Sequence, residues 1–143
     1  MEKMAVIYWS LSGNTQAMAE AIADGAQAAG ADVKLLQVSE ISAADAAQFD
    51  KIALGCPAMG AEVLEENEFE PFFTALEGQL RGKSVALFGS YGWGDGQWMR
   101  DWQERTAAAG AVLYQNEGLI VNEMPDEAGL TACRTFGAGF AGA

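Results

Sequence analysis

Histidine is absent from the 143 residues, and cysteine and proline are scarce, with two and three residues. Without histidine the chain lacks the commonest general base and metal ligand, which excludes serine-triad and papain-like catalysis and weakens most zinc chemistries. The two thiols, Cys56 and Cys133, are too few for a disulfide framework, and both stand among apolar residues. We therefore expect reduced thiols and a cytoplasmic protein.

Basic residues are also few, with 8 Lys and Arg against 20 Asp and Glu and a net charge of −12. This balance argues against nucleic acid and anionic membranes as partners, and it favours proteins with basic patches. No apolar run approaches the length of a membrane span, and the N-terminal residues do not form a signal peptide. Half of the residues are apolar, so we expect one folded domain over residues 1–143.

Short apolar runs alternate with helical patterns along the chain. Because parallel strands are joined by helical crossovers, this alternation predicts an α/β fold with a doubly wound, five-stranded parallel sheet. The mixed pattern of the second run places it near an edge of that sheet. The predicted strands cover 4–9, 33–38, 51–55, 84–89 and a broken fifth strand at 112–114 and 118–121, and the predicted helices cover 16–29, 42–48, 70–80, 97–109 and the end of the chain from Asp126.

The turn between the first strand and the first helix is Ser10-Leu11-Ser12-Gly13-Asn14-Thr15. A helix start presents unpartnered N–H groups and a positive dipole end, and Gly13 allows a close backbone approach. The turn therefore suits a phosphate held by neutral donors, since it contains no Lys or Arg. It matches neither G-x-x-x-x-G-K-[ST] nor G-x-G-x-x-G. An ordinary helix cap, with Asn14 or Ser12 as the cap residue, explains the turn equally well.

Two further loops follow the third and fourth strands, and in a doubly wound sheet they converge with the first turn. They are Pro57-Ala58-Met59-Gly60-Ala61-Glu62 and Ser90-Tyr91-Gly92-Trp93-Gly94. Trp93 between two glycines suits an exposed ring, and Met59 offers a soft apolar surface opposite it. A slot for a flat ring beside a phosphate turn predicts a mononucleotide, and flavin mononucleotide (FMN) fits best. Taken singly, Trp93, Met59 and Glu62 are ordinary surface or core residues.

These three loops together make the sequence resemble a short-chain flavodoxin from end to end. Residues 10–15 are similar to the family's phosphate loop, usually T/S-x-T-G-x-T, with Ser12 for the middle threonine and a bulky Leu11. Residues 57–62 and 88–96 resemble the two flavin loops, with Trp93 at the stacking position. The resemblance implies the flavodoxin-like strand order 2-1-3-4-5.

The resemblance also implies a low-potential one-electron carrier that uses non-covalently bound FMN between its semiquinone and hydroquinone forms, beside or in place of ferredoxins. The Gly60–Ala61 peptide is expected to reorient on reduction, and Glu62 to bond the N3 edge of the flavin. The phosphate is expected to be held by Ser10, Ser12, Asn14, Thr15 and Ser90, together with nearby backbone N–H groups. The cofactor-binding residues are thus Ser10, Leu11, Ser12, Gly13, Asn14, Thr15, Pro57, Ala58, Met59, Gly60, Ala61, Glu62, Ser90, Tyr91, Gly92, Trp93 and Gly94.

Acidic residues near these loops predict a negative rim that steers basic redox partners toward a monomeric carrier. The rim residues are Glu65, Glu66, Asp95 and Glu123.

Two other functions fit the same fold, and a third is rejected. An FMN-dependent NAD(P)H:quinone or flavin reductase would need a substrate pocket above the ring, and 143 residues offer no obvious extra lobe. A flavin-binding module of a larger assembly is opposed only by the absence of a linker. A phospho-accepting response regulator would need an aspartate at the end of the third strand, where Cys56-Pro57 stand.

Overall fold

A computed structural model describes residues 3–60 and 62–143 of the chain, so the expected Gly60–Ala61 peptide lies partly outside the described residues. The strands pair in parallel in the order β2-β1-β3-β4-β5, with β6 beside the far end of β4. The predicted α/β fold and strand order are confirmed, and the second strand lies at an edge. The strands are β1 (Lys3–Tyr8), β2 (Asp32–Gln37), β3 (Lys51–Gly55), β4 (Ser84–Tyr91), β5 (Val112–Leu113) and β6 (Leu119–Asn122).

The fifth strand is broken, as the sequence predicts. The first residues of β4, Ser84 and Val85, pair with β5, whereas its last four residues pair with β6. A short 3-10 segment, η2 (Tyr114–Asn116), lies between them, and Gln115 and Asn116 have φ values of 61° and 58°. The left-handed backbone at two consecutive residues turns the chain away from β4 and back to it.

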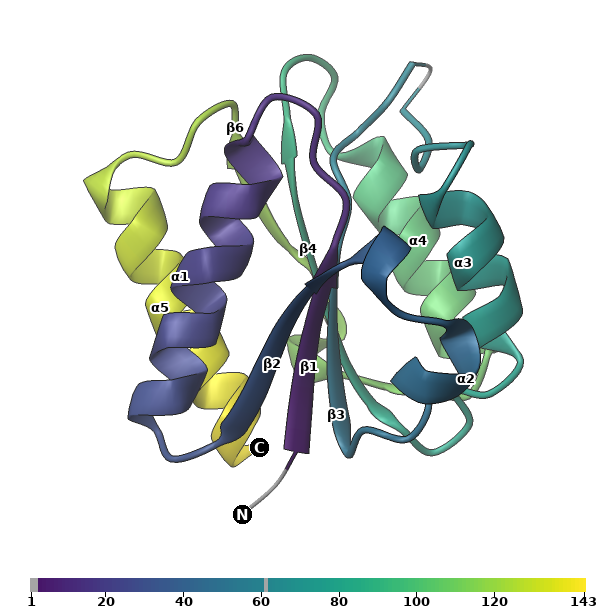
Figure 1. The fold of residues 1–143 in the computed structure, drawn as a ribbon. Coiled ribbons are helices and arrows are strands. Elements are labelled where there is room, and N and C mark those ends of the chain that lie inside the picture. Colours follow the sequence, from purple (N-terminus) through teal and green to yellow (C-terminus); the bar gives the residue numbers. More distant parts are fainter. Residues whose placement is uncertain (1–2, 61) are drawn as a thin grey trace.

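Helices cover both faces of the sheet (Figure 1). Helices α1 (Asn14–Ala28) and α5 (Glu127–Gly142) cover one face, and α2 (Ala43–Ala46), α3 (Phe69–Glu77) and α4 (Gln97–Ala108) cover the other. A second 3-10 segment, η1 (Val38–Glu40), follows β2. The loops after β1, β3 and β4 lie together at the carboxyl edge of the sheet, which is where such folds bind ligands.

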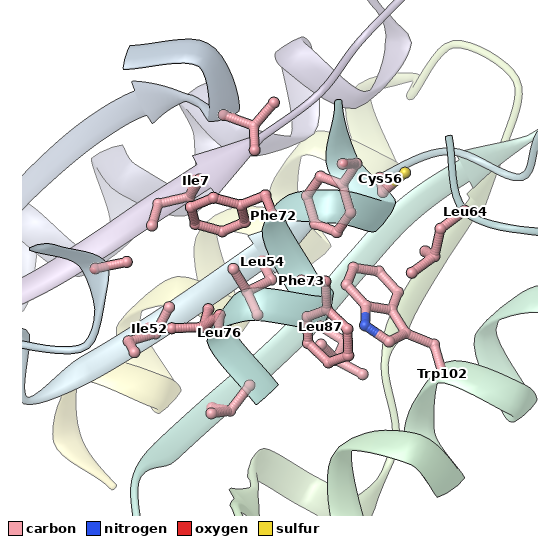
Figure 2. Close-up of a cluster of buried hydrophobic side chains, with 14 of the residues drawn as sticks. Ile7, Ile52, Leu54, Cys56, Leu64, Phe72, Phe73, Leu76, Leu87 and Trp102 are labelled. Atoms are coloured by element: carbon pink, nitrogen blue, oxygen red, sulfur yellow. The ribbon is translucent and has the colours of Figure 1, made fainter. Parts of the chain in front are cut away.

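The α3/α4 face of the sheet is filled by large apolar side chains. The Trp102 ring packs edge-on against Phe69 and Phe73, with centroids 5.4 and 5.9 Å apart and planes at 87°. The observed α3 ends at Glu77 and is therefore shorter than the predicted helix. Leu80, beyond its end, is nevertheless buried with these rings. Figure 2 shows the buried cluster in which Phe72, Phe73, Leu76 and Trp102 lie over Ile52, Leu54 and Leu87.

The α1/α5 face is packed through small residues. A Cβ built on Gly25 would lie 2.0 Å from the Arg134 carbonyl oxygen, and one on Gly137 would lie 2.0 Å from that of Ile22. Only glycine permits this contact, because the two helix backbones touch. The larger side chains of α5, Cys133, Phe136 and Phe140, are buried in the same cluster as α1.

Candidate functional site

The turn after β1 is organised by the Ser10 side chain. Gly13 is the N-cap of α1, with φ 96°, and it has no side-chain cap hydrogen bond. The Ser10 hydroxyl oxygen instead accepts hydrogen bonds from the N–H groups of Gly13 (3.1 Å) and Gln16 (3.3 Å). The alternative cap residues Asn14 and Ser12 are therefore wrong, because the left-handed Gly13 turns the chain so that the cap comes from three residues before it.

Two buried hydroxyl groups join this turn to the neighbouring strand ends. The Ser90 N–H donates to the Thr15 hydroxyl oxygen at 3.4 Å, which ties the start of α1 to the end of β4. The Ser90 hydroxyl donates to the Glu123 carbonyl oxygen at 2.7 Å, which ties β4 to the segment after β6. Glu123 has a φ of 57°, a left-handed conformation that this bond helps to hold. The proton of the Ser90 hydroxyl is thus used within the protein.

A hollow of about 230 Å³ opens between these loops. It brings together the first turn, the start of the loop after β3 and the end of β4, as the sequence predicts. Gly13, Gly60, Glu62, Trp93 and Gly94 lie outside its lining. The lining residues are Ser10, Leu11, Ser12, Asn14, Thr15, Pro57, Ala58, Met59, Ser90, Tyr91, Gly92 and Glu123.

Glu123 is a lining residue that the sequence analysis assigned only to the acidic rim. Its position after a strand was a usable signal, since the carboxyl ends of all parallel strands meet at one edge of the sheet.

The loop after β3 contains a tight hairpin. The N–H and carbonyl groups of Met59 and Val63 bond reciprocally, at 2.9 and 3.0 Å. Gly60 and Glu62 in its turn have φ values of 50° and 56°. The Glu62 carboxylate accepts the Gln97 N–H at 3.1 Å, so the hairpin contacts the start of α4.

The loop after β4 presents the predicted exposed ring. The Trp93 side chain is 65% exposed, as its flanking glycines indicate. At the end of β4, the Tyr91 ring packs on the buried Trp98 at a centroid distance of 5.7 Å, and the Trp98 indole N–H donates to the Cys56 carbonyl oxygen at 3.1 Å. The start of the loop is therefore held by packing and a hydrogen bond, whereas the Trp93 ring is exposed to solvent.

Glu65 is not part of an acidic rim. Its carboxylate is buried and accepts the N–H groups of Asn67, Glu68 and Phe69 at 2.7–2.9 Å, which caps the start of α3. Burial raises the pKa of this carboxyl, but the three N–H donors outweigh burial and hold the pKa below its ordinary value. An acid-rich stretch is typical of a solvated surface, which is why Glu65 was predicted to lie in the acidic rim. The prediction is wrong because the Glu65 side chain is buried at the start of α3.

Cys56 lies directly behind the site. Its thiol is fully buried, and its sulfur accepts the Glu65 N–H at 3.4 Å. Burial raises the pKa of the Cys56 thiol far above its ordinary value. The side chain is therefore a protonated packing element at neutral pH.

The chemistry of the lining fits a phosphate joined to a flat ring. Hydroxyl groups and free helix N–H groups gather at the first turn, and none of the twelve lining residues is a Lys or Arg. A Cβ built on Gly13, Gly60 or Gly92 would meet no atom within 4 Å, so the backbones of the three loops are open to close approach. Within the described part of the chain, no helix has the length and apolar character needed to cross a membrane.

A family model described as flavodoxin matches residues 6–137 of the chain. The chain is 50% identical over 132 residues to the flavodoxin of Megasphaera elsdenii, covering 92% of this chain and 93% of that protein. It is 50% identical over 125 residues to the flavodoxin of Clostridium beijerinckii, covering 87% and 90%. It superposes on the solution structure of the two-electron reduced Megasphaera elsdenii flavodoxin with a TM-score of 0.88 at 49% identity, covering 98% of this chain and 99% of that one.

Proposed function

This chain belongs to the flavodoxin family, whose members carry electrons with bound FMN, and we propose that the hollow between its three loops holds that cofactor. The chain is an electron-transfer protein, and the reductase alternative is not favoured by relatives that are half identical to it. FMN supplies the redox chemistry, and the protein binds and orients it. The observation that supports the site most directly is the joining of three separately predicted loops around one hollow.

The first turn is proposed to hold the phosphate through uncharged donors. Ser12 in the turn, and Asn14 and Thr15 at the start of α1, all line the hollow. The Ser10 hydroxyl already receives two N–H groups of this turn, so its own proton is free to be donated to a phosphate oxygen. We propose that Ser90 supports the site through Glu123 rather than through its hydroxyl proton.

The ring is proposed to lie between the loops after β3 and β4. Trp93 supplies an exposed aromatic face, and Met59 lines the hollow on the other side. The Gly60–Ala61 peptide is proposed to change orientation with the redox state, and the φ of 50° at Gly60 fits a residue that tolerates left-handed backbone. The Glu62 carboxylate is proposed to bond the polar edge of the ring.

The surroundings are proposed to make the reduced cofactor a strong reductant. No Lys or Arg lines the hollow, and the net charge of the protein is −12. The second electron brings negative charge into a site without a compensating cation, which lowers the potential at which it is accepted.

Binding and reduction together test this function. FMN and riboflavin differ by the phosphate, so isothermal titration with both should show much tighter binding of FMN. Thr15→Ala should reduce the difference in affinity between FMN and riboflavin. Anaerobic reduction should then proceed in two separated one-electron steps. A single two-electron step would favour the reductase, and a chain that takes up no FMN would refute the site.

The partner is proposed to be a redox protein with a basic surface that meets a monomeric carrier in the cytoplasm. The side chains of Leu11, Trp93 and Met124 are exposed and apolar, and the acidic Glu66 and Glu123 are exposed too, all of them in segments that follow strands of the sheet. The rate of electron transfer to a basic haem protein should fall with rising salt. A rate that does not respond to salt would contradict this partner chemistry.

A further inference from the structure

Helix α4 begins without a cap of its own. Its N-cap residue, Gly96, has φ 93° and no side chain that could accept a hydrogen bond. The first helical N–H, that of Gln97, is accepted instead by the Glu62 carboxylate, 35 residues earlier in the chain. A carboxylate at a helix start also meets the positive end of the helix dipole. The cap of α4 therefore comes from the loop after β3.

Glu62 is held in this position from its own side by the hairpin. The reciprocal Met59–Val63 bonds close the turn, and Glu62 has a φ of 56°, which a residue with a side chain rarely adopts. A strained backbone persists where its surroundings stabilise it. The bond to Gln97 is such a contact.

Gly94 makes room for the carboxylate. A Cβ built on Gly94 would lie 2.5 Å from Cδ of Glu62 and 2.6 and 2.7 Å from its two oxygens. Gly94 also has φ 84°, so a side chain there would be strained as well as obstructed. The loop that carries Trp93 is therefore shaped around the Glu62 side chain.

We propose that Glu62 is a positioning residue that fixes the spacing between the 59–63 hairpin and the loop that carries Trp93. Its Oε1 accepts the Gln97 N–H, which ties the carboxylate to the start of α4. Oε2 has no hydrogen-bond partner among the described residues and remains available to an N–H on the edge of a bound ring. The contact with α4 stands on the geometry alone, whereas its effect on the ring rests on the proposed function.

The contact with α4 is tested by amide hydrogen exchange at Gln97, measured on the chain without added flavin. Glu62→Ala should speed exchange at Gln97 roughly fivefold, the effect of a lost helix cap. Glu62→Gln keeps an acceptor oxygen and should restore most of the protection. Gly94→Ala should expel the unaltered carboxylate and reproduce the effect of Glu62→Ala.

Two controls separate this effect from charge and backbone strain. Glu66→Gln removes an exposed charge four residues away, and Gly82→Ala adds a Cβ at φ 76° where no atom lies within 4 Å. Both should leave exchange at Gln97 unchanged. Unchanged exchange in Glu62→Ala would overturn the proposal.

The positioning role is tested by the FMN dissociation constant of the same variants. Gly94→Ala, which leaves Glu62 in the sequence, should weaken FMN binding roughly fivefold or more, whereas Gly82→Ala should not. Faster exchange at Gln97 with unchanged FMN affinity would overturn positioning and leave a structural cap. A wild-type chain that binds no FMN would refute the proposed function, and the exchange result would still decide whether Glu62 caps α4.

Discussion

On the α3/α4 face of the sheet the helices bury large rings, whereas on the α1/α5 face they meet through glycine. Trp102 lies between Phe69 and Phe73 on the first face. Gly25 and Gly137 lie against carbonyl oxygens on the second. Both faces exclude water, but one does so with side-chain area and the other with close backbone approach. We therefore expect the first face to be sensitive to lost volume and the second to added volume.

The largest effect is expected on the aromatic face. Trp102→Ala removes a buried indole and should lower the free energy of unfolding by about 3–5 kcal/mol, measured by urea denaturation. Trp102→Phe is the matched variant, because the Trp102 indole N–H has no hydrogen-bond partner among the described residues. It should cost much less than Trp98→Phe, which removes the bond to the Cys56 carbonyl. Equal costs would show that the indole N–H groups do not matter.

The next effect is expected at the helix crossing. In Gly137→Ala, one added carbon meets the Ile22 carbonyl oxygen, so α1 and α5 must separate, at a cost of about 2–3 kcal/mol. Gly142→Ala in the same helix adds the same carbon where no atom lies within 4 Å. It should be neutral or slightly stabilising. If both variants unfold at the same urea concentration, the close approach is not important for stability.

A smaller loss of stability is expected from substitution of the helix caps, and it should differ between the two faces of the sheet. Glu65→Gln weakens three buried bonds at the start of α3 and should cost about 1–2 kcal/mol at neutral pH. Asp126→Asn at the start of α5 affects one exposed bond, to the Gly129 N–H, and should cost less.

The Glu65 effect should depend on pH. Since the pKa of Glu65 is lowered by folding, its stabilisation is complete above the carboxyl pKa of the unfolded chain and is lost as pH falls through the folded pKa. The gap between wild type and Glu65→Gln should therefore close on acidification. A gap that is constant between pH 7 and pH 3 would contradict the bonded carboxylate.

The smallest perturbation is chemical modification of the two thiols, one on each face of the sheet. Burial raises the pKa of Cys133 to about 11 and that of Cys56 further. At pH 8 the folded chain should react with a thiol reagent at least about a hundredfold more slowly than the denatured chain. Peptide mapping should show Cys133 modified before Cys56. Rapid modification of Cys56 in the folded chain would contradict its burial.

The fold could be predicted from the sequence because its strongest signals are local. Continuous apolar runs such as 4–9 and 84–89 are typical of strands buried on both faces, and the helices between them require parallel pairing. The helix over 70–80 could be predicted from its helical pattern, although α3 ends at Glu77. The Gly25–Gly137 crossing could not, since a glycine within a helix gives no sign of the backbone that approaches it.

The site could be predicted to the level of loops but not of hydrogen bonds. Turn chemistry identified the three loops that meet at the hollow. The Ser10 cap was missed because it depends on a left-handed Gly13, and the Glu62–Gln97 contact was missed because it joins loops 35 residues apart. Glu65 was misplaced because composition does not distinguish a solvated carboxylate from one that accepts three N–H groups.

The break in the fifth strand is a position at which the chain can accept an insertion. Because β5 and β6 are each aligned on β4 by their own pairing, neither depends on the other for its register. Residues inserted between Gln115 and Asn116, the exposed part of η2, would lengthen the segment between β5 and β6 without shifting the strand end that carries Glu123 to the hollow. A peptide tag or a sensor domain could therefore be introduced there, and the same joint would let evolution vary chain length while the cofactor loops stayed in place.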